Sequence, residues 1–393
     1  TRMSEVVVAP PLDAFIVGAG PVGLAAGCAL RAAGLRVVVA DAGPAERALE
    51  DTRVIALSAG SRDILRTLQA WPSADATSIG TIHISQRGHF GRTELRAADY
   101  GLDALGHVAR AGTVVRALRS RAQALGLDVR HELAVTGARE DGDFVQVDTA
   151  AGTFATRVLI WCEGRIADDE ALARSRDYGQ HAVIALATPM RPHGHVAYER
   201  FTPDGPVALL PCGRDYAVVF TCAAAEASAL RDEPDTQFLA RLSDALGGRV
   251  QFSALGPRSA WPLTLRMRAD VVRGHQVWLG NAAQTLHPVA GQGLNLALRD
   301  VGQLAECLLP VLARGEGDIA EVLERYGRLR RTDRAATGGF TDALVRIFGI
   351  GAGHPLLGPL AGHARGAALA LLDACPAARQ FIGRRMMFGA RGW

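Results

Sequence analysis

Residues 14–41 read AFIVGAGPVGLAAGCALRAAGLRVVVAD, in the order strand, glycine-rich turn, helix and strand. The first apolar run ends at Val17, and a G-x-G-x-x-G pattern follows it. An apolar helical pattern continues to Leu30, and a second apolar run ends just before Asp41. This arrangement is typical of the βαβ unit that begins a Rossmann-type domain. It predicts an α/β protein that holds the pyrophosphate of a dinucleotide at the N-terminus of its first helix.

Four residues of this stretch are candidates for contact with the dinucleotide. Gly18 and Gly20 permit a tight turn and a close approach of the backbone to the pyrophosphate, and Gly23 lets helix and strand pack closely. The carboxylate of Asp41 is placed to accept hydrogen bonds from the adenosine ribose. The pattern does not separate FAD from NAD, and glycines that only form a tight turn are the alternative interpretation.

A second stretch, residues 280–295, reads GNAAQTLHPVAGQGLN. Asn281 follows a short apolar run, where a polar side chain can hold a ribityl hydroxyl group. The turn at 291–293 exposes backbone N–H groups at the start of a helical pattern that extends to Leu312. These groups suit the pyrimidine edge of a flavin, where negative charge gathers on reduction. The two stretches together therefore favour FAD.

The second stretch resembles a flavin-contact motif of the FAD-dependent aromatic hydroxylases, the class A flavoprotein monooxygenases. YGQHA at 178–182, AYERFTP at 197–203 and LLP at 209–211 are similar to the branch that hydroxylates prenylated phenols in ubiquinone biosynthesis. The resemblance implies an α/β fold with a Rossmann-type FAD-binding domain, an interleaved mixed β-sheet substrate domain and a C-terminal helical segment.

The expected segments follow from this resemblance and from the change to strand-like, proline-interrupted sequence between His181 and Cys222. That change predicts a mostly antiparallel sheet in the second domain. The FAD-binding domain is assigned 12–72, 109–177 and 273–330, the substrate domain 73–108 and 178–272, and the helical segment 331–393.

The resemblance also implies cofactor contacts at the residues that match the family's motifs. These are Gly18, Gly20, Gly23, Asp41, Arg53, Arg116, Glu163, Gly280, Asn281, Gly291, Gln292, Gly293 and Asn295. Arg53 and Arg116 match arginines that lie along the cofactor, although a solvated arginine is the alternative for each. Glu163 lies in CEGRIA, residues 162–167, where the family usually has A-D-G-x-x-S. In relatives, that segment serves both FAD and the pyrophosphate of the nicotinamide cofactor.

Five more residues are candidates for the reaction itself. His287 and Pro288 lie beside the expected flavin and are the candidate catalytic residues. His181, Tyr198 and Pro211, from the expected sheet domain, are candidates to line the substrate cavity. Ordinary packing, of a histidine or of a sheet residue, is the alternative interpretation.

The resemblance implies a monooxygenase that uses FAD, NAD(P)H and O2 to hydroxylate a prenylated phenol in ubiquinone biosynthesis. The substrate is expected to be of the 2-polyprenylphenol or 2-polyprenyl-6-methoxyphenol type. Two alternatives remain open: an FAD-dependent reductase or dehydrogenase acting on a lipid, and a noncatalytic FAD-bound scaffold of the ubiquinone-biosynthesis complex. Other proteins of that pathway are possible partners.

The amino-acid composition excludes several other classes of protein and of chemistry. The 393 residues are 49% hydrophobic and 21% charged, with a net charge of +3. This mix is typical of a globular protein, and its dispersed charges do not indicate a nucleic-acid partner. The sequence contains no lysine, which excludes Schiff-base chemistry and a P-loop lysine.

Cysteine spacing and hydropathy complete the sequence-based expectations. The six cysteines are dispersed and predict neither a disulfide framework nor a metal site. We expect a cytoplasmic protein without a membrane span or a targeting segment. Residues 383–388, GRRMMF, allow a peripheral contact with the inner membrane.

Overall fold

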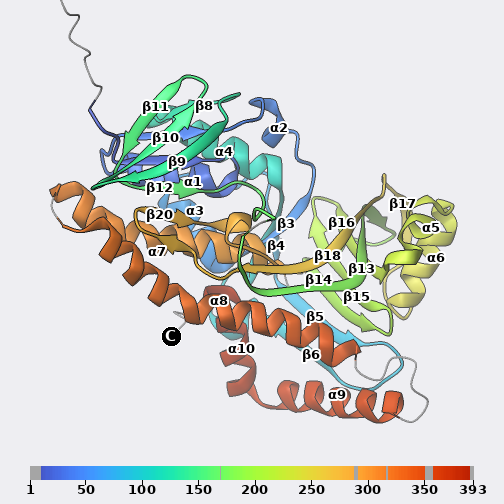
Figure 1. Cartoon of the computed structure of the whole chain (residues 1–393). Helices are drawn as coiled ribbons and strands as arrows, with labels where there is room; N and C mark the ends of the chain where they lie inside the picture. Colours follow the sequence, from blue (N-terminus) through green and yellow to red (C-terminus); the bar gives the residue numbers. More distant parts are fainter. Residues whose placement is uncertain (1–9, 169, 287–290, 316, 350–356, 390–393) are drawn as a thin grey trace, which may run out of the picture.

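The computed structural model describes residues 10–168, 170–286, 291–315, 317–349 and 357–389. Its first sheet has six strands in the order β19-β20-β12-β1-β2-β8. Figure 1 labels β8, β12 and β20 of this sheet in the upper left part of the molecule. The strands run parallel except for β19, which is antiparallel to β20. Their bounds are β1 Ala14–Val17, β2 Val37–Ala40, β8 Asp128–Arg130, β12 Leu159–Trp161, β19 Val272–Arg273 and β20 Gln276–Trp278.

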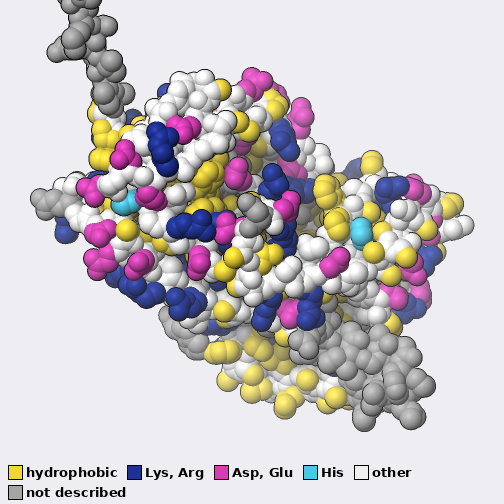
Figure 2. All heavy atoms as spheres, viewed as in Figure 1, with side chains coloured by type: hydrophobic (Ala, Val, Ile, Leu, Met, Phe, Trp, Pro, Cys, Tyr) yellow, Lys and Arg dark blue, Asp and Glu magenta, His cyan; other side chains and the backbone are white. Residues whose placement is uncertain are grey.

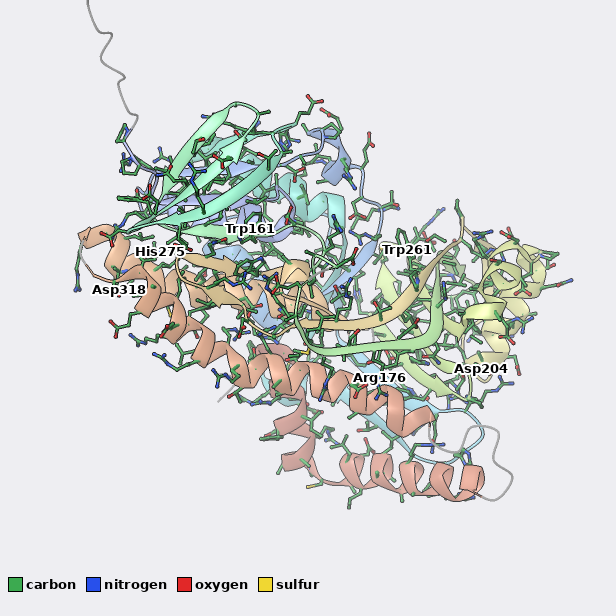
Figure 3. The ribbon with its side chains drawn as sticks, viewed as in Figure 1. Trp161, Arg176, Asp204, Trp261, His275 and Asp318 are labelled. Atoms are coloured by element: carbon green, nitrogen blue, oxygen red, sulfur yellow. The ribbon has the colours of Figure 1, made fainter. Side chains whose placement is uncertain are left out.

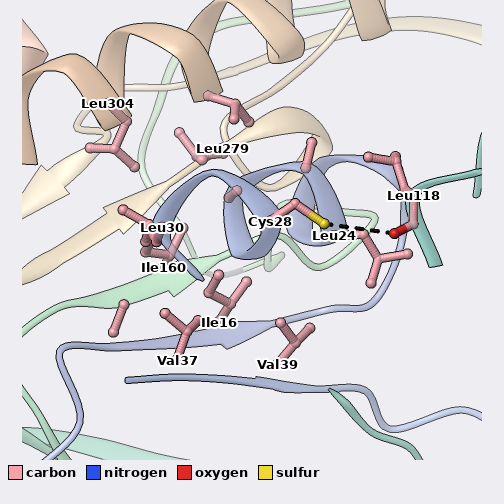
Figure 4. Packing of buried hydrophobic residues seen from close by; sticks show 14 of the residues in the cluster. Ile16, Leu24, Cys28, Leu30, Val37, Val39, Leu118, Ile160, Leu279 and Leu304 are labelled. Atoms are coloured by element: carbon pink, nitrogen blue, oxygen red, sulfur yellow. Dashed lines mark hydrogen bonds between the residues drawn. The ribbon is translucent and has the colours of Figure 1, made fainter. Parts of the chain in front are cut away.

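Alternating side chains on these strands build two separate apolar cores. Ile16 and Val39 are buried in a large core with three helices, α1 (Pro21–Ala32), α4 (Ala111–Ala124) and α7 (Gln292–Arg314) (Figure 4). Phe15 and Val38 point to the other face and pack in a second core with Val145. That second core is covered by a three-stranded antiparallel sheet of β9 (Val135–Asp141), β10 (Phe144–Thr149) and β11 (Gly152–Thr156). The predicted Rossmann-type domain is therefore confirmed.

The chain passes from one sheet to another around residues 129–135, between two separate strands. β8 ends at Arg130 and belongs to the parallel sheet, whereas β9 begins at Val135 in the three-stranded sheet. Glu132 lies between them with φ +55°, in the left-handed region. A single extended strand cannot pass through that conformation, so the chain turns from one sheet to the other.

The second large sheet has nine strands, ordered β21-β18-β13-β16-β15-β14-β5-β6, with β17 beside β13. It is mixed because β5 and β14 are parallel, whereas the other pairs are antiparallel. Strands from 81–96 thus join strands from 172–285 in one sheet. The bounds are β5 Thr81–Gln86, β6 Arg92–Arg96, β13 Leu172–Pro189, β14 Val196–Thr202, β15 Gly205–Cys212, β16 Asp215–Ala223, β17 Phe252–Leu255, β18 Ser259–Arg268 and β21 Gln284–Thr285.

One face of this sheet is covered by two helices, α5 (Ala227–Asp232) and α6 (Asp235–Ala245). Val183, Leu209 and Val218 from the sheet form a buried core with Phe238 of α6. Between the two large sheets, β3 (Val54–Ser58), β7 (Gly106–Arg110) and β4 (Thr77–Ile79) form a small antiparallel sheet. The expected α/β architecture with an interleaved mixed sheet is confirmed.

Three helices close the chain: α8 (Ile319–Gly349), α9 (Leu357–Ala374) and α10 (Pro376–Phe388). Helix α8 packs along α7, α9 lies against β6, and α10 lies against α3 (Ala59–Thr67). None of the helices in the described ranges combines the length and the apolar character needed to cross a membrane.

Candidate flavin site

The glycine-rich turn after β1 is held closely against the end of β12. Gly18 has φ +107°, and a side chain there would place its Cβ 2.6 Å from the carbonyl oxygen of Cys162. A Cβ at Gly23 would overlap the carbonyl oxygen of Gly18. These two glycines are therefore required by the close packing of turn, helix and strand, as the sequence pattern predicts.

Asp41 lies at the end of β2 and fastens this turn. Its Oδ2 accepts a hydrogen bond from the Ala19 N–H at 2.7 Å, and its Oδ1 accepts one from the Gly43 N–H at 2.8 Å. A carboxylate accepts about four hydrogen bonds, so lone pairs remain for a ribose. The residue is partly buried, which leaves one side of it open.

Three glycines of the predicted motifs border open space. No atom of the described residues lies within 4 Å of where a Cβ would be at Gly20, Gly164 or Gly293, apart from local backbone. Gly20 caps α1 and Gly293 lies in the first turn of α7, while Gly164 follows β12. The starts of two helices thus have room beside them, and free N–H groups at such positions attract the negative charge of a phosphate or a reduced flavin.

The start of α7 is fixed to β3 by Asn295. Its Oδ1 accepts hydrogen bonds from the Ser58 N–H (2.8 Å) and the Ser61 hydroxyl (2.6 Å), and its Nδ2 donates to the carbonyls of Ala56 (2.9 Å) and Gly291 (2.6 Å). Gly291 has φ +59° and packs against Ala56. Because the buried Asn295 amide is fully used within the chain, it shapes the turn and does not point to a ligand.

The other residues of the second motif occupy the same region. Gly280 has φ +60° and lies against Val22 of α1. Asn281 is exposed in a short 3-10 helix, Gly280–Ala282. Gln292 is buried, and its Nε2 donates to the Met386 carbonyl at 3.4 Å, which joins α7 to α10. The motif therefore connects the first helix with the end of the chain.

The arginines and Glu163 lie on the outside of this region. Arg53 is exposed and forms a hydrogen-bonded ion pair with Asp51 at 2.6 Å, which raises the pKa of Arg53. Arg116 is exposed on α4, and Glu163 is exposed after β12. Their contact with a cofactor stays a prediction.

The structure describes three of the five residues that were predicted to take part in the reaction or to bind the substrate. His287 and Pro288 lie outside the described residues. His181, Tyr198 and Pro211 lie on the face of the nine-stranded sheet that packs against α5 and α6, as shown by their register with core residues. That face is turned away from the six-stranded sheet, so their predicted role in a substrate cavity has no support from this placement.

A buried charge network between α7 and α8 was not expected from the sequence. Arg330 donates to Asp300 at 2.6 Å and to Asp333 at 2.7 Å, and Arg299 donates to Asp333 at 3.1 Å. Although burial lowers the pKa of Arg330, the nearby charge of Asp300 raises it overall. Gln284 donates to Asp300 at 2.9 Å. The network therefore joins Gln284 of the second motif to α7 and α8. Asp300 and Arg330 are 30 positions apart in the sequence, so no local pattern indicates their contact.

The described residues offer no candidate site for a metal ion. Within the described ranges, no three His, Cys, Asp or Glu side chains are grouped so that they could hold a metal ion.

Comparison with known proteins identifies the family of this fold. A family model described as an FAD binding domain matches residues 11–337. The chain belongs to this FAD-binding family. FAD is accordingly the cofactor of this flavoprotein, in agreement with the open space beside the starts of α1 and α7.

Two relatives resemble the flavoprotein over most of its length. It is 31% identical over 354 residues to the ubiquinone hydroxylase UbiL of Rhodospirillum rubrum, covering 86% of this chain and 81% of that protein. It is 29% identical over 344 residues to the 3-demethoxyubiquinol 3-hydroxylase of Escherichia coli, covering 82% and 86%. Among solved structures, p-nitrophenol 4-monooxygenase PnpA of Pseudomonas putida has the same fold, with a TM-score of 0.73, 17% identity and coverage of 97% and 99%.

Proposed function

We propose that this flavoprotein is an aromatic hydroxylase that adds oxygen to a prenylated phenol in ubiquinone biosynthesis, with NAD(P)H and O2 as co-substrates. The observation that carries the proposal is the pair of helix starts, at Gly20 and Gly293, that border open space on a chain related to ubiquinone hydroxylases. Bound FAD would supply the redox chemistry that activates O2 with electrons from NAD(P)H.

The residues of the chain have distinct tasks in this function. The N–H groups at the start of α1 bind the pyrophosphate, and Asp41 binds the ribose with its remaining lone pairs. The N–H groups at the start of α7 stabilise negative charge at the pyrimidine edge of the flavin ring. Asn295 holds that turn in place from behind.

The sheet domain has the second task, which is to hold the phenol and keep water from the reaction. Figure 3 shows the two sheets beside each other, with Trp161 on β12 of the first and Trp261 on β18 of the second. The face of the nine-stranded sheet opposite α5 and α6 is turned toward β3 and β7. We place the substrate between that face and the start of α7.

Peripheral membrane contact fits a substrate with a long apolar tail. Figure 2 shows hydrophobic side chains gathered over α9 and α10, where Leu371 is 71% exposed and Phe381 is 48% exposed. The segment 383–388 contributes less to this exposed hydrophobic surface than its sequence suggests, because Met387 is buried and Gly383 lies against Tyr100. Pathway proteins that bind the same surface are the other partners we propose.

To test this proposal, the FAD-loaded protein is incubated with a 2-polyprenylphenol, NAD(P)H and isotopically labelled O2. The product is then analysed by mass spectrometry. Labelled oxygen in the ring supports the proposal. NAD(P)H oxidation stimulated by the phenol but without labelled product would instead indicate a reductase or dehydrogenase. FAD binding without any stimulated oxidation would indicate a scaffold.

A further inference from the structure

The nine-stranded sheet has one face buried under α5 and α6 and another face that carries a carboxyl group among apolar side chains. Val183, Leu209 and Val218 are buried under α5 and α6. On the opposite face, Ile184, Val219, Ala208 and Glu199 are neighbours in register across β13, β16, β15 and β14, and all four are partly exposed. This row is apolar except for Glu199.

The row faces the flavin-binding part of the molecule. Two residues before Glu199 on the same strand, Ala197 packs with Val108 of β7 and Ile79 of β4. The same cluster includes Val54 of β3, the strand that carries Ala56 against Gly291. A short series of contacts therefore joins the start of α7 to the face that carries Glu199.

The neighbouring strand β5 also contacts the flavin-binding part of the molecule, next to Glu199. Its neighbour in register on β5 is Ile84, which packs with Ala59 of α3 and Met387 of α10. Glu199 thus lies between two packed clusters on the face turned toward the flavin site.

The Glu199 carboxyl group has one oxygen that is available to a ligand. Its Oε1 is buried and makes no hydrogen bond within the described residues. Burial alone raises the pKa of Glu199 to about 8, so the group is mostly protonated at neutral pH. Buried polar atoms in folded proteins are nearly always hydrogen-bonded, and an unpaired one suits a ligand that supplies the missing donor.

We propose that Glu199 binds the phenolic hydroxyl group of the substrate, while the row of Ala208, Val219 and Ile184 contacts the apolar remainder. The phenolic O–H donates to the free oxygen of the carboxyl group, and no bond is made or broken in this step. This inference rests on the proposed function and adds the residue that selects a phenol.

The test compares binding of a 2-polyprenylphenol with binding of its O-methyl ether, which lacks the donor. Dissociation constants are measured by titration of the FAD-loaded protein. We expect the wild type to prefer the phenol at least tenfold, and Glu199→Leu to bind both ligands with similar affinity. Glu199→Gln should keep the preference within a few-fold, because its amide oxygen still accepts a hydrogen bond.

Glu94→Leu is the matched control. Glu94 lies in register with His83, which is in register with Tyr198, so it is on the opposite face, where it pairs with Arg96. This variant should keep the wild-type preference. FAD binding by each variant checks that it folds, and Glu199→Ala repeats the test if the leucine variant does not fold.

The outcomes separate the two proposals. If the wild type prefers the phenol and Glu199→Leu or Glu199→Ala keeps that preference, Glu199 is not the binding group, while the proposed function stands. If the wild type binds no prenylated phenol, the proposed function and this inference are both wrong.

Discussion

At the scale of single residues, Asp41 has two tasks, and the sequence pattern indicates only one of them. The pattern indicates contact with ribose, whereas the structure shows that both carboxylate oxygens also hold the backbone of the glycine-rich turn. Loss of this side chain therefore removes a ligand contact and the support of the turn that binds the pyrophosphate.

We expect Asp41→Ala to weaken FAD binding at least tenfold, because hydrogen bonds to a charged group contribute about 1.5–3 kcal/mol each. Fluorescence titration of the apoprotein with FAD measures the change. Asp128→Ala, which removes only a surface ion pair with Arg130, is the control and should bind FAD as the wild type does. Unchanged affinity in Asp41→Ala would mean that the ribose is held elsewhere.

Two glycines of the flavin motifs should respond differently to substitution. Gly293→Val adds atoms to open space, so the apoprotein should unfold near the wild-type temperature while FAD binding and coupled hydroxylation fall sharply. Gly23→Ala should lower the unfolding temperature itself, because its Cβ would overlap the Gly18 carbonyl. Thermal unfolding with and without FAD distinguishes these cases. Full coupled activity in Gly293→Val would contradict the placement of the flavin at the start of α7.

The Glu199 carboxyl predicts a dependence of stability on pH. Its pKa in the folded protein, about 8, is higher than the ordinary glutamate value, so the folded state holds the proton more tightly. The stabilisation is complete at low pH and is lost as the pH rises toward and through 8. Glu199→Gln cannot ionise, so its unfolding temperature should increase relative to the wild type between pH 6 and about pH 9. A constant difference across that range would show that the carboxyl group is not dehydrated.

At the scale of elements, the junction of α7 and α8 is held by buried charges. Asp300 accepts from Arg330 and Gln284, and Arg334 donates to Gln284 at 2.6 Å. Removing one partner of a buried ion pair leaves the other charge without compensation, which is why such substitutions are costly.

We expect Asp300→Ala to lower the free energy of unfolding by about 3–5 kcal/mol, measured by urea denaturation. Glu324→Gln, in the exposed pair with Arg328 on α8, should change this free energy by at most about 0.5 kcal/mol. Equal effects of the two substitutions would contradict a structural role for the buried network.

Local patterns predict those parts of the fold that depend on neighbours in sequence. The turn at Gly18 and the helix after Gly291 follow from short motifs, because their geometry is set within a few residues. The direction of a strand's side chains depends instead on what covers each face of the sheet. For this reason Tyr198 and Glu199, adjacent in one motif, could not be assigned to the packed and the open face before α5 and α6 were placed.

At the scale of the whole molecule, the proposed substrate lies between the flavin site and the sheet face that carries Ile184, Ala208 and Val219. A prenyl tail buried there gains about 0.8 kcal/mol per methylene group. We therefore expect a prenylated phenol to bind more than tenfold more tightly than unsubstituted phenol, as measured by competition for the FAD-loaded protein. Tighter binding of small polar aromatics would exclude the prenylated substrate and leave the flavoprotein assignment intact.

The parallel pairing of β5 with β14 has a consequence for how the chain reaches this structure. β5 spans residues 81–86, and its partner, residues 196–202, leaves the ribosome after more than a hundred further residues. At about 5–20 residues per second, the edge of β5 that pairs with β14 in the finished sheet stays free for several seconds. Such an edge can join the strand of another chain, so slow elongation and a high concentration of newly made chains should favour aggregation over assembly of the nine-stranded sheet.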